Sequence, residues 1–331
     1  MLAITITDQK EPIQLVEKPI PSPAKDQVLV RIKAAALNRR DQWIRQGMYP
    51  NIQFGTILGS DGAGVVEAMG DEVDRGLIGK EIIINPNMNW GNNSQAQSAD
   101  YHIVGMPTDG TLAEYLVVDV NQLVAKPAHM SWEEAAALPL GGLTAFRACF
   151  HHGQIEEGKN VLISGVGGGV AQFAFQFALA KGANVYVTSG SEEKGGRCMA
   201  MGAKGAFNYK SETWHKEALK TTGGFDTVID SAGGDQINTF IKTMKPAGRI
   251  VFYGATNGMP AKIDIFRMFW NQITLQGSTM GSDIEFSEMV AFVQTHQIKP
   301  IIDSTFELEN GLEAFDKIKN GVFGKVVLVN F

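Results

Sequence analysis

Apolar and polar residues alternate in short runs through the first third of the chain. Apolar side chains recur at every second position in residues 2–6 and again in residues 28–34. A period of two places successive side chains on opposite faces of a strand, as in half-buried antiparallel sheets. The pattern therefore predicts a β-rich N-terminal region. Residues 85–109 interrupt it with a long polar stretch, which we expect to form a surface lobe.

The periodicity changes near Ser131. This serine precedes Glu134 by three residues, a capping-box spacing typical of a helix start. Short apolar runs then alternate with helical segments: VLISGV, VYVTS, TVIDSAG and RIVFYGA. Such alternation indicates βαβ units and a doubly wound parallel sheet. Near Phe266 the pattern becomes mixed again and ends in the strand-like KVVLVNF. The sequence thus predicts an α/β protein with a β-rich part and a parallel-sheet part.

Composition narrows the class of protein. A length of 331 residues is comfortable for two domains that share an interface. The formal net charge of −6 and a pI near 5.6 argue against a nucleic-acid or anionic-membrane partner. Two cysteines exclude a disulfide scaffold and favour a reducing compartment. With no signal peptide and no apolar run of about 20 residues, we expect a cytoplasmic protein.

A glycine-rich turn carries the most specific chemistry. The run VLISGVGGGVA at 161–171 passes from an apolar strand through glycines into a helix. A pyrophosphate binds to backbone N–H groups at such a helix start, where larger side chains would keep it away. The flanking strand and helix, and a second strand about 20 residues on, match the dinucleotide-binding fingerprint. The predicted cofactor contacts here are Gly165, Gly167, Gly168, Gly169 and Val170.

The tip of the next strand bears on which dinucleotide is bound. A site for NAD usually places a carboxylate there for the ribose 2′-hydroxyl, whereas this chain reads TSGSEEK. Ser191 is a candidate helix cap and Lys194 lies in the first turn, where a cation opposes the helix dipole. A 2′-phosphate would explain that cation, and Ser189 and Ser191 would assist. The alternative is a solvated Lys194 balanced by neighbouring glutamates.

The order of several motifs resembles the medium-chain dehydrogenase/reductase superfamily. These motifs are GSDGAGVVEAMGDEV at 59–73, DGTLAEYLVV at 109–118, AAALPLGGLTAFRAC at 135–149 and the glycine turn. The resemblance covers essentially the whole chain. It implies a GroES-like catalytic domain in residues 1–124, a Rossmann dinucleotide-binding domain in 125–266 and a return to the catalytic domain in 267–331. It also implies an active site in the cleft and a homodimer formed through the Rossmann domain.

Zinc-dependent members of the superfamily hold a catalytic zinc ion with Cys, His and Cys ligands and a Glu beside the His. At the matching positions this chain has Asn38, Ser60, Asp61 and Leu140. These are poor substitutes for the thiolate and imidazole ligands that zinc prefers. The polar lobe, where the resemblance places a structural zinc loop, has no cysteine. We therefore predict no metal site. A second possibility, Cys149 with His151 and His152, lacks a fourth ligand.

Without zinc ligands, the chain resembles the quinone oxidoreductase branch, which includes zeta-crystallin-like reductases. Asn38 and the Tyr49 of GMYP are typical of that branch. The branch implies NADPH, with Lys194 and Tyr209 reaching the 2′-phosphate and Thr144 under the nicotinamide. Gly254, after the RIVFY run, completes the predicted cofactor set. Two departures are Ala171, at the usual third glycine, and Gly195-Gly196 inside a predicted helix.

A site without a metal favours an acceptor that already delocalises the incoming charge, such as a quinone or an α,β-unsaturated carbonyl. Asn38 and Tyr49 are the candidate hydrogen-bond donors to its oxygen, although they could instead be a turn residue and a cleft-wall aromatic. Arg39, Arg40 and Asp41 read as a local ion network. An alcohol dehydrogenase with an unrecognised metal site and a nucleotide-binding module without turnover stay as alternatives.

Overall fold

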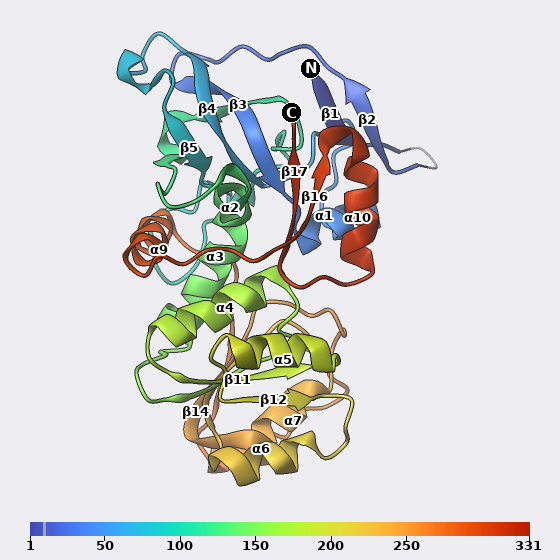
Figure 1. Cartoon of the computed structure of the whole chain (residues 1–331), viewed down its shortest axis with the longest axis vertical. Coiled ribbons are helices and arrows are strands. Elements are labelled where there is room, and N and C mark those ends of the chain that lie inside the picture. Colours follow the sequence, from blue (N-terminus) through green and yellow to red (C-terminus); the bar gives the residue numbers. More distant parts are fainter. Residues whose placement is uncertain (9–10) are drawn as a thin grey trace. The chain divides into compact units, whose positions relative to one another are not determined.

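The computed structural model describes residues 1–8 and 11–331, which divide into two compact units. One unit combines Met1–Leu143 with Ser282–Phe331 and is rich in β-strands. The other unit is Thr144–Gly281 and contains a parallel sheet (Figure 1). This confirms the predicted fold class, a β-rich domain whose two pieces come before and after a doubly wound domain in the sequence.

The main sheet of the β-rich unit has seven strands. Six follow the order β16-β17-β3-β4-β5-β9, and β8 pairs with the free part of β3. All neighbours are antiparallel except β16 and β17. These strands are β3 (Gln27–Ala36), β4 (Asp61–Met69), β5 (Glu81–Ile84), β8 (Tyr115–Asp119), β9 (Leu123–Ala125), β16 (Ile302–Glu307) and β17 (Lys325–Val329). Two small sheets pair β1 (Leu2–Ile6) with β2 (Ile13–Glu17) and β6 (Asn87–Met88) with β7 (His102–Ile103).

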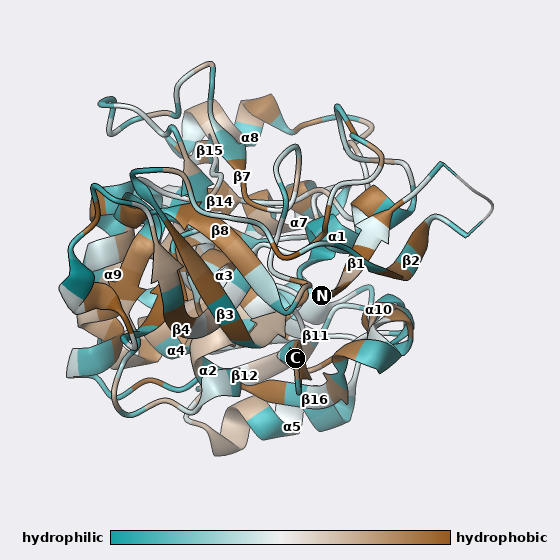
Figure 2. Cartoon of the chain, turned by 90° about the horizontal axis from the view of Figure 1, so that it is seen from above, coloured by the Kyte–Doolittle hydropathy of each residue, from teal (hydrophilic) through white to brown (hydrophobic). Residues whose placement is uncertain are grey.

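The core of this unit lies against the long strands of the main sheet. Val30 and Ile32 of β3 and Leu328 of β17 are completely or almost completely buried, as is Phe315. Figure 2 shows β3 and β4 as mostly hydrophobic along their lengths. The helices of the unit are α1 (Arg39–Arg45), α2 (Trp132–Ala137), α9 (Asp283–Thr295) and α10 (Gly311–Lys319), and α3 (Pro139–Phe146) crosses into the second unit. The capping box predicted for Ser131 and Glu134 opens α2.

The second unit is a six-stranded parallel sheet in the order β12-β11-β10-β13-β14-β15. This strand order is that of the Rossmann fold, in which the strand order reverses between β10 and β13 while all strands stay parallel. In Figure 1, α4 and α5 cover one face of the sheet and α6 and α7 the other. The strands are β10 (Asn160–Ile163), β11 (Asn184–Ser189), β12 (Gly205–Asn208), β13 (Phe225–Asp230), β14 (Met244–Phe252) and β15 (Thr274–Gly277). The helices are α4 (Gly169–Ala180), α5 (Glu192–Ala200), α6 (Trp214–Thr222), α7 (Gln236–Thr243) and α8 (Ile265–Trp270).

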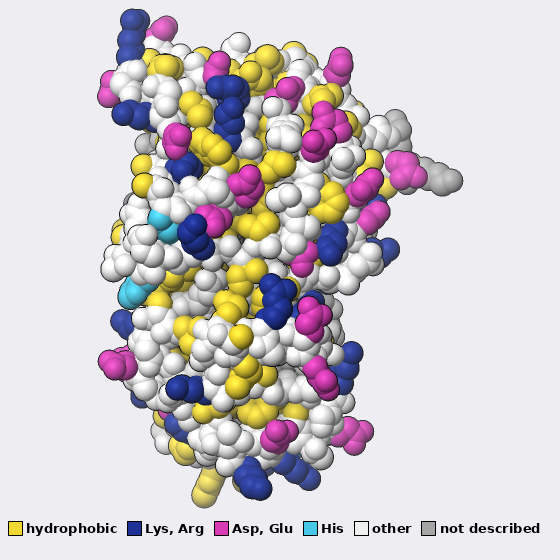
Figure 3. Space-filling view, in the orientation of Figure 1, with side chains coloured by type: hydrophobic (Ala, Val, Ile, Leu, Met, Phe, Trp, Pro, Cys, Tyr) yellow, Lys and Arg dark blue, Asp and Glu magenta, His cyan; other side chains and the backbone are white. Residues whose placement is uncertain are grey.

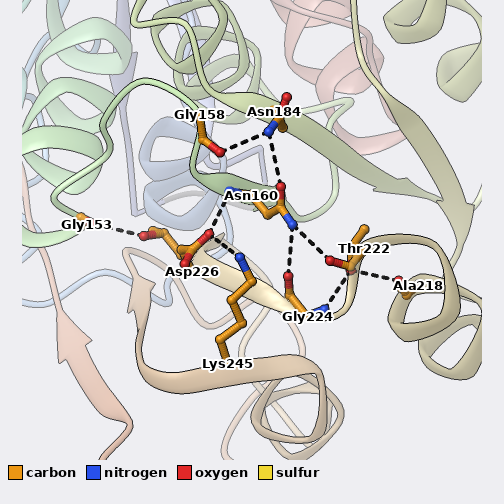
Figure 4. Close-up of polar contacts among 10 residues, drawn as sticks. Gly153, Gly158, Asn160, Asn184, Ala218, Thr222, Gly224, Asp226 and Lys245 are labelled. Atoms are coloured by element: carbon orange, nitrogen blue, oxygen red, sulfur yellow. Dashed lines mark hydrogen bonds and ion pairs between the residues drawn. The ribbon is translucent and has the colours of Figure 1, made fainter.

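A polar network ties the amino ends of the central parallel strands together (Figure 4). The Asn160 amide and the Lys245 ammonium both donate to Oδ2 of Asp226, each at 2.8 Å. The side chain of Asn160 reaches the carbonyl oxygens of Thr222 and Gly224 at 3.0 and 3.2 Å. Because these bonds use the amino ends, they hold the sheet without occupying its carboxyl ends, where ligands of open α/β sheets bind.

The boundaries between the units differ from those expected from the sequence. Residues 125–143 lie in the β-rich unit, because α2 packs against β3, β4 and β17. Residues 267–281 lie in the Rossmann unit, because β15 pairs with β14 at the edge of its sheet. Helical and strand-like patterns identify elements, but they do not show which sheet an element joins.

The surface of the described chain carries charges of both signs. On the face seen in Figure 3, basic and acidic side chains are interspersed and form no large area of one sign. Among the described residues, no helix has the length and apolar character needed to cross a membrane. Of the stretch 85–109 that was expected to form a surface lobe, residues 91–97 are exposed, but its two ends are partly buried. Trp90 is buried and meets Tyr101 edge to face, and Val104 and Met106 are buried as well.

Candidate functional site

Strand register brings three distant polar residues to one end of the β-rich sheet. Ala36, the last residue of β3, pairs with Asp61 on β4 and with Val327 on β17. Asn38 follows β3 by two residues, and Lys325 is the first residue of β17. The pairing of the three strands therefore places Asn38, Asp61 and Lys325 side by side.

These three side chains form a buried hydrogen-bonded cluster, which we call the Asn38–Asp61–Lys325 cluster. The Lys325 ammonium donates to Oδ1 of Asn38 at 2.7 Å and to Oδ2 of Asp61 at 2.8 Å. Nδ2 of Asn38 donates to the same Asp61 oxygen at 2.8 Å, and the Leu140 amide donates to the other at 2.7 Å. The oxygen and the nitrogen of the Asn38 side-chain amide are therefore both hydrogen-bonded within the cluster. In this structure Asn38 holds the ion pair between Asp61 and Lys325.

A second cluster surrounds the guanidinium of Arg40, the second residue of α1. Nη1 donates to Oγ of Ser60 and to the Val104 carbonyl, the latter at 2.9 Å. Nη2 donates to Oη of Tyr49 at 3.2 Å and to the Met106 carbonyl at 3.4 Å. All four partners are neutral oxygens. The local ion network expected for Arg39, Arg40 and Asp41 is present only in part. Arg39 is exposed and Arg40 is hydrogen-bonded to no carboxylate among the described residues, but the charge of Arg40 acts on Asp41.

Charged residues of both clusters act on the carboxyl group of Asp41. Its side chain is fully buried, and Oδ2 accepts the Asn38 amide at 2.7 Å while Oδ1 has no hydrogen-bond partner among the described residues. Burial raises the pKa of Asp41 from 3.8 to about 6, although the charge of Arg40 and the Asn38 hydrogen bond oppose the shift. The Asp41 carboxyl therefore changes between its protonated and ionised forms at a pH slightly below neutral.

The four positions that the resemblance assigns to zinc binding do not offer a zinc-binding set. Asn38 and Asp61 hold an ammonium group, Ser60 bonds to Arg40 and Val104, and Leu140 has no donor atom in its side chain. Zinc sites use thiolate, imidazole and carboxylate ligands in tetrahedral convergence. Among residues 1–8 and 11–331, no group of three His, Cys, Asp or Glu side chains could hold a metal ion. The residues present therefore do not fit zinc.

The glycine turn in the Rossmann unit has the geometry of an anion-binding loop. Gly165 follows β10 with a positive φ of 56°, and Gly168 is the N-cap of α4. A Cβ on Gly168 would meet no atom closer than 3.9 Å, so the space beside the turn is open. Gly167, Gly169 and Val170 are partly exposed, and the amides of the first helical turn have no partner within the helix. The turn therefore fits a pyrophosphate as the sequence predicts.

The tip of β11 brings together residues that are far apart in sequence. Ser191 caps α5 by accepting the Lys194 amide at 3.4 Å, and buried Ser189 accepts the Ser191 amide at 3.1 Å. A Cβ on Gly190 would lie 2.7 Å from Oη of Tyr209 and 2.9 Å from Cε of Lys210. The absence of a side chain at Gly190 thus lets Tyr209 and Lys210 approach the strand tip.

Lys210 was missed by the sequence interpretation, although it directly follows Tyr209 in FNYKSE. The signal that could have found it is the second cation beside the predicted 2′-phosphate residues.

Asp230 was also missed. This buried carboxylate at the end of β13 accepts the Ser164 hydroxyl and the Gly233 amide, the latter at 2.8 Å. It joins the carboxyl ends of the two central strands, beside the glycine turn.

The remaining predicted cofactor residues lie in the same unit. Thr144 is buried on α3, and its hydroxyl donates to Sδ of Met280 at 3.6 Å. Gly254 follows β14, and a Cβ there would lie 2.8 Å from the Ser231 carbonyl oxygen. Close backbone packing thus accounts for this glycine. The predicted site residues fall into two sets, with Asn38 and Tyr49 in the β-rich unit and all the others in the Rossmann unit.

Comparison with protein families assigns both units. Residues 24–128 match the family described as alcohol dehydrogenase GroES-like domain, and residues 169–295 match the family described as zinc-binding dehydrogenase. A solved structure of an NAD-dependent alcohol dehydrogenase is 35% identical, with a TM-score of 0.94 and coverage of 100% of both chains. A crotonyl-CoA carboxylase/reductase solved in complex with NADP is 25% identical, with a TM-score of 0.89 and coverage of 99% and 94%.

Three curated relatives span the same range of names. A zinc-type alcohol dehydrogenase-like protein of Leptosphaeria maculans is 36% identical over 96% of this chain and 94% of its own length. A crotonyl-CoA carboxylase/reductase of Cereibacter sphaeroides is 30% identical over 90% of this chain and 78% of its own. A chloroplastic quinone-oxidoreductase homolog of Spinacia oleracea is 28% identical over 95% and 92%. The chain belongs to the medium-chain dehydrogenase/reductase superfamily and is an oxidoreductase of that superfamily.

Proposed function

We propose that the chain is a zinc-independent NADPH-dependent reductase that transfers hydride to a quinone or an α,β-unsaturated carbonyl. The observation that carries the reaction class is the Asn38–Asp61–Lys325 cluster, whose donor set does not fit zinc. A Lewis acid is what oxidation of a simple alcohol would require in this superfamily. A conjugated acceptor spreads the developing negative charge, so hydrogen-bond donors suffice to stabilise it.

The preference for NADPH rests on the tip of β11. No carboxylate ends this strand, which closes with Thr188 and Ser189. Tyr209 and Lys210 approach the tip from the segment after β12, and Lys194 lies in the first turn of α5, whose N-cap Ser191 follows the tip. Two cations and a phenol are suited to bind a 2′-phosphate, because charge-assisted hydrogen bonds to phosphate are among the strong ones.

The names of the relatives support the proposed class of acceptor, and they also include an alternative function. Three of those described above are named as a crotonyl-CoA carboxylase/reductase or a quinone-oxidoreductase homolog, and one of these, a solved structure, contains NADP. Others are named alcohol dehydrogenases, one of them zinc-type and one NAD-dependent. An alcohol dehydrogenase is therefore the second candidate, and a nucleotide-binding protein without turnover is the third.

We also propose a homodimer formed through the Rossmann unit. Phe266, Phe269 and Trp270 of α8 are 68%, 64% and 73% exposed. β15, which follows α8 in the sequence, is an edge strand that pairs only with β14 in the part of the chain that the structure describes. Exposed aromatic side chains beside an open sheet edge are typical of protein–protein interfaces. Sedimentation of the purified chain tests this proposal, and a monomer at micromolar concentration would contradict it.

The test of the reaction follows NADPH absorbance with 1,4-naphthoquinone, 2-cyclohexenone and a saturated aldehyde in parallel. We expect turnover of the first two acceptors and little turnover of the aldehyde. Reduction of the aldehyde alone, or oxidation of ethanol with NADP⁺, would favour the alcohol dehydrogenase. Elemental analysis of protein purified without chelators should find no stoichiometric zinc. NADPH binding without turnover of any acceptor would favour the non-catalytic protein.

A further inference from the structure

Arg40 is a buried cation to which no carboxylate of the described residues is hydrogen-bonded. Arg40 is 6% exposed, and its four hydrogen bonds go to neutral oxygens. The Nε atom of its guanidinium has no hydrogen-bond partner among the described residues. Buried charges in proteins are usually paired, because removing a charge from water is unfavourable. The charge of Arg40 acts on Asp41, but the Asp41 carboxyl accepts its hydrogen bond from the Asn38 backbone amide instead. The positive charge of Arg40 is thus available to another anion.

The contact between Arg40 and Tyr49 fixes how the phenol can be used. A guanidinium has only donors, so in the 3.2 Å contact Oη of Tyr49 must be the acceptor. The guanidinium carbon also lies 4.8 Å from the centre of the Tyr49 ring, which fixes the ring. Tyr49 is partly exposed, and among the described residues its hydroxyl proton has no acceptor. The phenol therefore keeps its proton for a ligand.

We propose that Arg40 is a positioning residue that holds Tyr49 as the proton donor to the oxygen of the acceptor. This inference rests on the proposed reduction of a conjugated carbonyl. When a hydride adds to the β-carbon of the conjugated acceptor, its electron pair forms the new C–H bond, and the π electrons of the acceptor shift onto the carbonyl oxygen. That oxygen takes the proton from Oη of Tyr49, which leaves a phenolate beside the Arg40 guanidinium. The phenolate regains a proton from water, so one NADPH and one proton reduce one acceptor by two electrons.

The arrangement explains why Arg40 bonds to several carbonyl oxygens as well as to Tyr49. Oγ of Ser60 and the Val104 carbonyl accept from Nη1, and the Met106 carbonyl accepts from Nη2, so both terminal nitrogens of the guanidinium are held. A phenolate formed next to a fixed cation needs little rearrangement of its surroundings, which is the advantage of a preorganised site. Arg40 would also hold the 104–106 segment against α1, and the experiment must separate this structural role from the positioning role.

The first test is a kinetic cycle with Arg40→Met, Tyr49→Phe and the double variant, assayed with 2-cyclohexenone. We expect Tyr49→Phe to lower kcat about a hundredfold and Arg40→Met to lower it at least about tenfold, with the NADPH KM nearly unchanged. Because Arg40 acts through Tyr49, the double variant should be no slower than Tyr49→Phe. Arg40→Lys, which keeps a charge and donors, should recover part of the loss. Independent, multiplicative losses would overturn the proposal.

Arg45→Ala is the matched control, because it removes a cation from the same helix. Arg45 pairs with Asp316 at 2.6 Å and lies over the ring of Phe315, and its hydrogen bond and its ring contact among the described residues do not involve Tyr49. Its kcat should be unchanged. Thermal unfolding of each variant reports the structural role, and a case in which Arg40→Met lowers Tm but leaves kcat unchanged contradicts the positioning role. If Arg40→Met fails to fold, Arg40→Lys and Arg40→Lys with Tyr49→Phe give the same comparison.

The second test needs neither NADPH nor turnover. 4-Nitrophenol binds as a phenolate where donors stabilise an oxyanion, and its ionised form absorbs visible light. We expect the wild-type protein to bind the phenolate form and Arg40→Met and Tyr49→Phe to weaken it about tenfold or more. Failure of the wild-type protein to bind it at millimolar concentration would overturn the oxyanion site. If no acceptor is reduced but the Arg40-dependent binding is found, the proposed function fails and the assignment of Arg40 stands.

Discussion

The Nζ atom of Lys325 lies 2.8 Å from Oδ2 of Asp61, and the two side chains are 5% and 0% exposed. Lys325 begins β17 and Asp61 begins β4, so the pair joins two strands that both pair with β3. Burial removes the hydration of both charges, and only good geometry with further hydrogen bonds offsets that loss. Asn38 and the Leu140 amide supply those bonds, so the pair depends on the whole cluster.

Lys325→Met should lower the free energy of unfolding by about 3–5 kcal/mol, because it leaves the Asp61 carboxylate buried without its cation. Urea unfolding at neutral pH measures the change. The double variant with Asp61→Asn should recover much of the stability, since no charge is then left unpaired. The exposed pair of Lys25 and Glu72, with side chains 70% and 59% exposed, provides the control. Lys25→Met should change stability by less than about 1 kcal/mol, and an equal effect of the two methionines would contradict the prediction.

Asp41 predicts a pH dependence of stability. Its pKa is 3.8 in the reference state and about 6 in the folded chain, so folding binds a proton in this range. Stability therefore falls as the pH rises from about 4 to about 6, by up to about 3 kcal/mol, and the contribution is constant above this range. Asp41→Asn removes this titration. Between pH 4 and pH 7 the wild-type protein should lose stability that Asp41→Asn does not lose. The unfolding free energy of the variant should therefore rise relative to that of the wild type as the pH increases. A difference independent of pH would exclude the shifted pKa.

Much of the fold could be predicted because its signals are local. The alternation of apolar runs with helical segments predicts the parallel sheet, and the glycines at 165–169 mark where its first strand turns into α4. Ser191 also caps α5 as expected. The Gly195-Gly196 pair is explained only in part. A Cβ on Gly195 would lie 3.2 Å from Cβ of Ala206, whereas Gly196 faces open space, and nothing in the structure explains it.

The candidate site was harder to predict because strand pairing assembles it. Lys325 is 264 residues from Asp61 in the sequence, and no local pattern around it indicates a buried cation. Arg40 looked like a member of a charged run, since its burial depends on the distant carbonyls of Val104 and Met106. The boundary near residue 125 was misplaced for the same reason, because α2 packs on strands that lie far away in sequence.

The tip of β11 predicts which residues select the cofactor. Lys194→Ala and Lys210→Ala should each weaken NADPH binding about tenfold or more while leaving NADH binding nearly unchanged, because a charge-assisted bond to phosphate contributes roughly 1.5–3 kcal/mol. Titration of protein fluorescence with each dinucleotide measures both affinities. Equal losses for NADPH and NADH would show that the lysine does not contact the 2′-phosphate.

Lys204 provides the control for this prediction. It is an exposed lysine that directly precedes β12, and its amide bonds to Val185 at the amino end of the sheet rather than at the β11 tip. Lys204→Ala should therefore leave both affinities unchanged. A loss of NADPH affinity in this variant would point to a general effect of net charge rather than to a specific phosphate contact.

The glycine turn predicts that two neighbouring glycines respond differently to substitution. Gly168 has φ of −75° and open space at its Cβ position, so Gly168→Val should fold normally. The added side chain would nevertheless stand where a pyrophosphate approaches the start of α4, and dinucleotide binding should be lost.

Gly165 has φ of 56°, a conformation that costs an L-residue about 1 kcal/mol or more. Gly165→Ala should therefore lower the unfolding free energy by about that amount. Calorimetry with NADPH and urea unfolding of both variants separate ligand exclusion from backbone strain, and unchanged NADPH affinity in Gly168→Val would show that the turn is not the cofactor site.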